Sequence, residues 1–369
     1  MTTRFADQPM VVISGKTEIP VANLWLLLLY ASKFYGSGSE TLGGAERYPE
    51  LLPELLAEIL VASVGERIRQ PLTPVFSPAA GDLGRVRGRI DVLRTESHQL
   101  LRRGKIACRF EQLTVDSPRN RMVLAALKSI EPLVKSKELA TACRTTAREL
   151  ERLGVSTTYG AREKTSAERR TTRNDNRDRR MFHAAQLALS LDLPTNTAAS
   201  NVISRNHLDI HEFRRLFEAA VGGFYKATLT RLGWSVSPGR QLSWRVQQPS
   251  GEALSLLPQM QTDIILEHAA TRRRIIIDTK FTSILGRGKG GKETFKSGHL
   301  YQLYAYLRTQ ESESDELSGS TEGMLVYPAT GPSINESFVL SNHKITAVTI
   351  DLARPAVEVR AQLLEIVRL

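Results

Sequence analysis

Residues 261–267 read QTDIILE and residues 273–280 read RRIIIDTK, and these two runs decide the fold of the C-terminal half. Each run is rich in β-branched residues, and a few turn-like residues separate them, so the pattern predicts a β-hairpin. A turn centred between positions 270 and 271 places Asp263 opposite Asp278. The hairpin therefore brings two carboxylates together on one side of a sheet.

The same register sets the charges along the hairpin. It pairs Glu267 with Arg274, whereas Asp263 and Asp278 are like charges that repel when directly opposite. Lys280 projects from the same face as Asp278, but one ammonium group cannot offset two acids and also serve a substrate phosphate. Two carboxylates with waters and phosphate oxygens suit Mg²⁺. We therefore predict a Mg²⁺ (or Mn²⁺) site with Asp263 and Asp278 as ligands.

Such a site has the composition of a phosphodiester-cleaving centre. The metal would polarise the scissile phosphate and lower the pKa of a bound water, while Lys280 would orient that water or stabilise the developing charge. On the helix expected at 300–307, Gln302 and Tyr306 share one face and could turn toward the site. The alternative is an ordinary half-exposed hairpin with surface acids, followed by a partly buried aromatic helix.

The composition fits a globular protein that handles a polyanion. The 369 residues are 41% hydrophobic and 24% charged, which is typical of a packed soluble chain of about two or three domains. A net charge of +11 favours nucleic acid, because Lys and Arg displace counterions from phosphates, although a generally basic protein has the same charge. Cys108 and Cys143 lack zinc or disulfide spacing. No apolar run is long enough to cross a membrane, so we expect a cytoplasmic protein.

Periodicity predicts an α/β fold (α+β overall), in which an N-terminal region of helices and short strands precedes a mixed central sheet flanked by helices. The expected elements of the N-terminal part are an enclosed apolar helix at 19–32, a helix at 51–70, a loop at 71–84, a strand at 85–93, a helix from about 120 capped by Ser117, and a helix at 136–153. Residues 162–180 form a charged run that is either a solvated surface or a phosphate-contacting face.

The second half continues with alternating helices and strands. The expected elements are a helix at 210–232, strands around Trp244 and at 262–267, 274–281 and 323–327, and a helix at 300–307. Between strand and helix, Lys289 and Lys292 flank two glycines. This run does not have the GxxxxGK[ST] pattern of a phosphate loop, and a DNA-facing loop suits it better.

An ordered series of motifs covers the chain from about residue 19 onward. These are IPVANLWLLLLYA at 19–31, RGRID at 87–91, FE at 110–111 with Asp116, PRNR at 118–121, LP at 257–258, DTK at 278–280, YQL at 301–303 and LVYP at 325–328. The order D, DxK, QxxxY resembles the nuclease motifs of the RecB-like branch of PD-(D/E)xK enzymes. The whole series resembles the McrC family, the nuclease subunit of the modification-dependent McrBC restriction system.

The resemblance implies that residues 201–369 form a PD-(D/E)xK endonuclease domain that cuts DNA with Mg²⁺ in a 5-methylcytosine-type restriction system. It implies catalytic roles for Asp263, Asp278, Lys280 and Gln302. Glu218, on the preceding helix, is a candidate further catalytic carboxylate, with a helix-surface acid as the alternative. Thr279 joins Asp263 and Asp278 as a candidate metal ligand.

The resemblance also implies a partner. A GTP-hydrolysing AAA+ ring would bind and translocate DNA, and residues 1–200 would dock into this ring and stimulate its GTPase. Because this sequence has no phosphate loop, the motor must be another chain. The alternatives are a self-sufficient RecB-like repair nuclease and a non-catalytic activator of the ring.

Two N-terminal motifs allow a structural interpretation as well. Residues 87–91 could contact the ring or a phosphate, but a strand with a solvated basic side explains them too. The group Glu111, Asp116, Asn120 and Arg121 is expected to form a hydrogen-bonded corner at a helix start rather than a second active site.

Overall fold

The computed structural model describes residues 10–13, 17–36, 42–69, 75–160, 175–199, 210–287, 291–331 and 333–368. The chain forms two compact units, one combining Met1–Leu52 with Leu193–Leu369 and the other comprising Pro53–Asp192. These units do not follow the expected boundary at residue 200, because the first 52 residues pack with the C-terminal part. The functional roles expected for the two halves stay predictions.

The first unit is built around a mixed six-stranded sheet in the order β14-β15-β13-β10-β9-β6. Its strands are β6 (Trp234–Pro238), β9 (Ile264–His268), β10 (Arg273–Thr279), β13 (Glu322–Pro328), β14 (Asn335–Leu340) and β15 (His343–Ile350). The central strands β10, β13 and β15 run parallel, whereas β14, β9 and β6 join antiparallel. The expected mixed sheet is confirmed.

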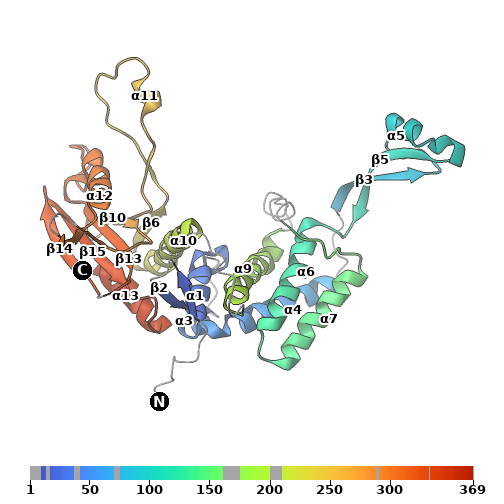
Figure 1. Ribbon diagram of the computed structural model, residues 1–369, viewed down its shortest axis with the longest axis horizontal. Coiled ribbons are helices and arrows are strands. Elements are labelled where there is room, and N and C mark those ends of the chain that lie inside the picture. Colours follow the sequence, from blue (N-terminus) through green and yellow to red (C-terminus); the bar gives the residue numbers. More distant parts are fainter. Residues whose placement is uncertain are drawn as a thin grey trace. The chain divides into compact units, whose positions relative to one another are not determined.

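Helices cover both faces of this sheet (Figure 1). Helix α12 (Ser297–Gln310) lies on one face, where Leu303, Tyr306 and Leu307 are buried against Ile276 and Leu325. Helices α10 (Ile210–Leu229) and α13 (Ala356–Arg368) pack on the opposite face and meet each other. Asp278 lies two residues after Ile276 on β10, so the two side chains point to the same side of the sheet. The acids therefore lie on the face that α12 covers.

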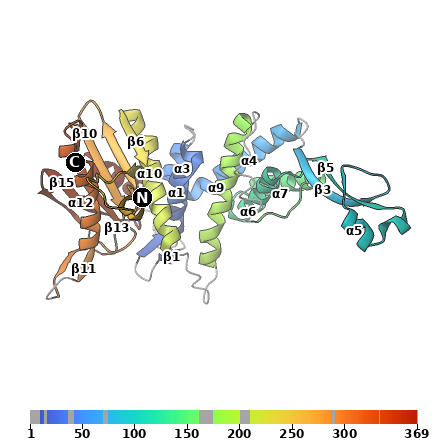
Figure 2. The same ribbon diagram turned by 90° about the horizontal axis from the view of Figure 1, so that it is seen from above.

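An apolar N-terminal helix completes this unit. After the hairpin of β1 (Met10–Ile13) and β2 (Thr17–Pro20), α1 (Val21–Ala31) lies beside α10, followed by α2 (Lys33–Gly36) and α3 (Leu42–Arg47) (Figure 2). A Cβ on Gly223 would lie 2.0 Å from the carbonyl oxygen of Tyr30, so only glycine permits this approach. The enclosed helix is confirmed, but it is buried against α10 rather than available to a partner.

The second unit is mainly helical. Its helices are α4 (Leu52–Arg69), α6 (Pro118–Ile130), α7 (Lys137–Arg152) and α9, whose full bounds are Asp175–Ala199. Ser117 accepts from the Asn120 amide and Ser136 from the Leu139 amide, so both helix starts are capped. The three helices expected at 51–70, near 120 and at 136–153 are confirmed.

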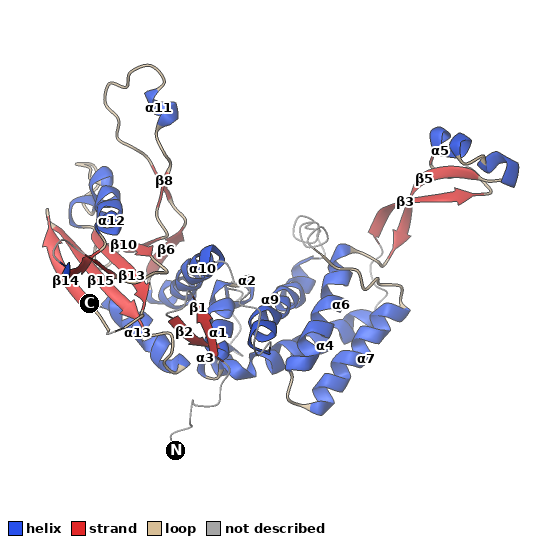
Figure 3. Cartoon of the chain, viewed as in Figure 1, coloured by secondary structure: helices blue, strands red, loops and turns tan. Residues whose placement is uncertain are grey.

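A long β-ribbon with a short helix at its end belongs to the same unit (Figure 3). It consists of β3 (Val75–Leu83), β4 (Arg89–Ile90), α5 (Val92–Ser97) and β5 (Ile106–Thr114). The loop expected at 71–84 is wrong for 75–83, because pairing along β5 outweighs the local effect of Pro78 and Gly81. The strand expected at 85–93 is reduced to two residues, since Asp91 caps α5.

Two further expectations need correction or lie outside the described residues. Trp244 is not in a strand: β7 (Gln241–Leu242) ends before it, and a long segment containing α11 (Ala253–Leu256) leads to β8 (Met260–Gln261). Lys289 and most of the charged run, namely residues 162–174, lie outside the described residues. Among those described, no helix is long and apolar enough to cross a membrane.

Candidate functional site

The hairpin of β9 and β10 has the predicted register. Glu267 pairs with Arg274 and Ile265 with Ile276, so the same register extended by two residues sets Asp263 against Asp278. Asp263 lies one residue before β9, and Asp278 lies near the end of β10.

Asp278 is a fully buried carboxylate. Neither of its oxygens accepts a hydrogen bond of normal geometry from the described residues, although the Lys280 Nζ lies 2.6 Å from Oδ2 as an ion pair. Burial raises the pKa of Asp278 to about 6; the Lys280 charge opposes this shift and the Asp263 charge adds to it. A buried carboxylate without hydrogen bonds is costly, so this arrangement favours an additional cation.

Asp263 is fixed by the strand opposite it. Its Oδ2 accepts a hydrogen bond from the Thr279 amide at 2.6 Å and a second from the Thr279 hydroxyl at 2.7 Å. The Thr279 side chain thus orients Asp263, while its predicted role as a metal ligand stays a prediction. One Asp263 oxygen, Oδ1, accepts no hydrogen bond in the described part of the chain.

Glu218 is brought to these acids by aromatic packing. Phe281, next to Lys280, contacts Phe213 at 5.7 Å and Phe217 at 5.8 Å between ring centroids, which clamps α10 against the end of β10. Burial raises the pKa of Glu218 to about 6, and the charges of Asp263 and Asp278 add to the shift. The half-buried Glu218 is therefore close enough to interact electrostatically with both acids, unlike an isolated acid on a helix surface.

Lys280 connects the carboxylates to α12. Its Nζ donates to the Gln302 Oε1 at 3.1 Å, and the Gln302 Nε2 donates to the Tyr306 hydroxyl at 2.6 Å. Gln302 and Tyr306 thus share a helix face toward the sheet, as their spacing predicts. The chain Asp278–Lys280–Gln302–Tyr306 holds the ammonium group in place.

Three acids and one adjacent ammonium leave the site with excess negative charge. No three His, Cys, Asp or Glu side chains form a complete metal-binding group within the described ranges. Mg²⁺, however, is commonly held by one or two carboxylates plus waters and substrate phosphates. The unbonded oxygens of Asp278 and the Oδ1 of Asp263 fit this incomplete type of site.

One contact of the site has no counterpart in the sequence-based predictions. The His299 Nδ1 lies 2.9 Å from the Tyr327 hydroxyl, and the Asp278 charge contributes, after burial, to a raised pKa of Tyr327. His299, Gln302 and Tyr306 are spaced three and four residues apart on one helix. This spacing is the feature of the sequence that could have indicated His299 as a residue of the site.

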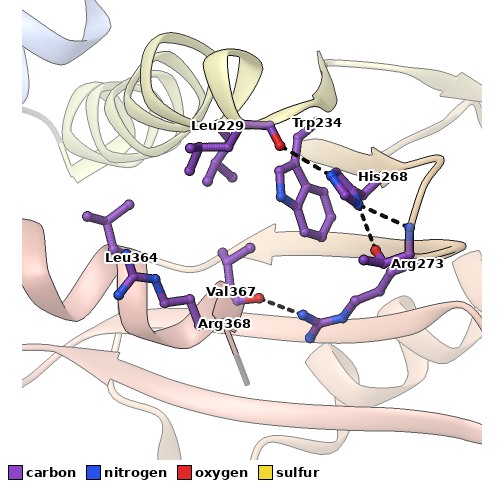
Figure 4. A pocket seen from close by; sticks show the side chains of 9 residues that line it. Leu229, Trp234, His268, Arg273, Leu364, Val367 and Arg368 are labelled. Carbon is purple, nitrogen blue, oxygen red and sulfur yellow. Dashed lines mark hydrogen bonds between the residues drawn. The ribbon is translucent and has the colours of Figure 1, made fainter.

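A pocket of about 230 Å³ lies at the turn end of the hairpin, away from the acids (Figure 4). It is lined by Leu229, Leu232, Trp234, His268, Thr271, Arg273, Leu364, Val367 and Arg368. Two of its polar side chains are engaged internally: His268 bonds to Thr271 and to the Leu232 carbonyl, and Arg273 donates to the Val367 carbonyl. This pocket does not offer the chemistry of the acidic site.

The N-terminal motifs form structural contacts. Arg121 makes two hydrogen bonds to Asp116, and Asn120 donates to the Val115 carbonyl, which confirms the expected corner at a helix start for these three residues. Glu111 is not part of it, because it lies exposed on β5. In the ribbon, Asp91 caps α5 and pairs with Arg109 at 2.8 Å.

Comparison with known proteins places this architecture in a family. Residues 8–328 match the family described as McrBC 5-methylcytosine restriction system component. The chain belongs to this family. The McrC-family resemblance seen in the motifs is thereby confirmed.

The McrBC-family chain is similar to the type IV methyl-directed restriction enzyme EcoKMcrBC of Escherichia coli (strain K12), with 24% identity over 361 residues, covering 94% of this chain and 97% of the relative. Among solved structures, it is similar to a half-complex from a tetradecameric assembly of Thermococcus gammatolerans McrB AAA+ hexamers with bound McrC (15% identity, TM-score 0.40, 85% of this chain and 68% of that chain). It is also similar to a chain of the Thermococcus gammatolerans McrBC complex (16% identity, TM-score 0.31, 50% and 60% covered).

Proposed function

We propose that this chain is the DNA-cleaving subunit of a modification-dependent restriction system, a Mg²⁺-dependent endonuclease of the PD-(D/E)xK type that works with an AAA+ GTPase. The observation that carries the proposal is the buried Asp278, whose oxygens accept no hydrogen bond from the described residues and which lies beside Lys280 and close to Asp263 and Glu218. A protein retains so costly a group where a ligand completes it.

Asp263 and Asp278 would hold the metal, which when bound would polarise the scissile phosphate and acidify a water molecule. Thr279 keeps Asp263 oriented toward this position. Lys280, fixed by Gln302, would stabilise charge that develops on the phosphate. Glu218, half-buried and with a raised pKa, would serve as the third carboxylate of the site.

Membership of the McrBC family supports a partner that is another component of the restriction system, and we propose that this partner supplies nucleotide-driven movement on DNA. The sequence contains no GxxxxGK[ST] phosphate loop, so the proposed AAA+ GTPase is a separate chain of the McrB kind. We propose that this AAA+ GTPase binds the β-ribbon formed by β3, β4, α5 and β5. Val92, Leu93 and Leu101 near its far end are 62%, 84% and 58% exposed, and we propose that they form the apolar part of this interaction surface.

Cleavage of methylated and unmethylated plasmid tests the nuclease. We expect wild-type protein with the AAA+ partner, GTP and Mg²⁺ to cut methylated DNA, and Asp278→Asn to bind the partner without cutting. Efficient double-strand cutting by the lone chain would favour the self-sufficient nuclease. Undiminished cutting by Asp278→Asn would reject the site, and GTPase stimulation without any cutting by wild type would favour the non-catalytic activator.

The partner surface needs a separate test. Leu93→Ser should weaken stimulation of the partner's GTPase and leave the melting temperature unchanged, because the side chain is exposed. Leu340→Ser on β14 is a control at another exposed apolar position of the chain. Equal stimulation by wild type and Leu93→Ser would remove the end of the ribbon from the proposed interface.

A further inference from the structure

His299 lies in the first turn of α12 and is oriented by a buried tyrosine. Its Nδ1 is 2.9 Å from the hydroxyl of Tyr327, which is 1% exposed. Tyr327 belongs to β13, where Leu325 pairs with Asp278, so two residues further Tyr327 is level with Lys280 on the same sheet face. The imidazole is thus anchored at the edge of the acidic site.

Three cationic side chains lie near His299, at the edge of the acidic site. Burial is the largest cause that lowers the pKa of His299 to about 4, and the charges of Lys280, Lys296 and Arg214 lower it further. These cations come from β10's end, from the residue before α12 and from α10. His299 is therefore neutral near pH 7, in a setting that would attract an anion.

If the Tyr327 hydroxyl is the donor, its hydrogen bond selects one tautomer of His299. Tyr327 stays protonated because burial raises its pKa, and within the described residues its hydroxyl has His299 as its hydrogen-bond partner. The simplest arrangement has the hydroxyl donating to Nδ1, which places the imidazole proton on Nε2. The Nε2 of the half-exposed ring makes no hydrogen bond in the described part of the chain. A neutral N–H donor is therefore available among three cations.

We propose that His299 contacts DNA, donating its Nε2–H to a backbone phosphate adjacent to the one that is cut, and that Tyr327 is a positioning residue that fixes the required tautomer. This inference rests on the proposed function in taking DNA as the ligand. It adds a neutral phosphate contact to a site in which the other contacts are charged. The competing interpretation is that His299 merely satisfies the buried Tyr327 hydroxyl.

Two amide substitutions separate these interpretations. In His299→Asn the amide occupies the place of Nδ1, so it can still bond to Tyr327 but cannot reach the phosphate. In His299→Gln the amide extends to the place of Nε2 and can still donate. His268→Gln is the matched control, because His268 lies at the turn end of the hairpin, five residues beyond Asp263.

Binding is measured in the Asp278→Asn background, without metal, with a fluorescent duplex oligonucleotide over a series of salt concentrations. We expect His299→Asn to weaken binding about 10- to 100-fold, as for loss of a hydrogen bond to a charged group. His299→Gln should recover much of this loss, and His268→Gln should bind like the parent. The salt slope should stay unchanged for His299→Asn, whereas Arg214→Gln should reduce it by about one.

His299→Asn binding within about twofold of the parent would overturn the inference, as would equal losses for Asn and Gln. A reduced salt slope in His299→Asn would also overturn it, because the contact would then be charged. Tyr327→Phe should weaken binding in the same direction without changing the salt slope, and unchanged binding would exclude its positioning role. Since binding needs no cleavage, failure of the nuclease assays and failure of this inference are distinguishable.

Discussion

The two ends of the β9–β10 hairpin differ in how their charged side chains are paired. At the turn end, Arg274 lies 2.6 Å from Glu267 and 2.6 Å from Asp315, and the adjacent Arg273 pairs with Glu322. At the other end, Asp263 is set against Asp278 near Glu218, and Lys280 is the ammonium group in contact with Asp278. One hairpin thus carries matched and unmatched charges within a few residues.

This difference separates structural charges from functional ones. Matched pairs gain modest Coulomb energy and hold neighbouring segments together. Unmatched buried acids destabilise the fold unless a ligand is bound, so their retention indicates a role in binding or catalysis. The comparison predicts that substitutions at the acidic end change activity, whereas those at the turn end change stability alone.

The largest expected effect is on cleavage. Asp278→Asn removes a proposed metal-ligand charge and should lower the rate of Mg²⁺-dependent cleavage by at least about 10³-fold, which corresponds to several kcal/mol. A gel assay of plasmid linearisation measures it, with circular dichroism to confirm folding. Cutting at a tenth of the wild-type rate would mean that the two ends of the hairpin do not differ in function.

Lys280→Ala should have the next largest effect. Loss of one preorganised electrostatic stabiliser costs about 10²- to 10³-fold in rate, or about 2.7 to 4 kcal/mol. Gln302→Ala frees the Lys280 ammonium without removing it, so its loss should be smaller. If Lys280→Ala cuts normally in single-turnover assays, Lys280 has only the structural role of neutralising Asp278.

The acidic end should also make metal-free protein sensitive to pH. The pKa of Asp278 is raised to about 6 from 3.8, so the folded state binds this proton more tightly than the unfolded state. The corresponding stability is complete below about pH 4 and is lost as pH rises through about 6, on the order of 3 kcal/mol.

Asp278→Asn lacks this titration, so its melting temperature should increase relative to wild type between pH 4 and 7. Scanning calorimetry in EDTA measures the difference. A constant difference across this range would contradict an unmatched buried acid at position 278.

The smallest effect is expected at the turn end. A double-mutant cycle of Glu267→Gln and Arg274→Gln should give a coupling energy of about 0.5 to 1 kcal/mol, because both side chains are partly exposed. Urea denaturation measures this coupling, and plasmid cleavage by each variant should equal that of wild type. A tenfold loss of cleavage in any of them would erase the distinction between the two ends.

Local sequence was sufficient for the hairpin and for the shared helical face of Gln302 and Tyr306. A strand alternates sides every residue and a helix returns to the same face after three or four, so short spacings specify which side chains meet. The same local rules failed for residues 75–83, where pairing with β5 forms a strand despite Pro78 and Gly81. They also failed for Trp244, because β7 pairs with β8 through Gln241 and Leu242 and this pairing stops two residues before Trp244.

The sequence by itself determined the register of the hairpin, the facing acids, the lysine beside them and the family motifs that run along the chain. Only the tertiary structure decided that Phe281 packs on α10 and so brings Glu218 to the acids. It likewise decided that Tyr327 holds His299 and that α1 packs against α10 through Gly223. The physical reason is that these contacts join residues of different elements, far apart in the sequence, and depend on which faces of the helices and the sheet become buried together.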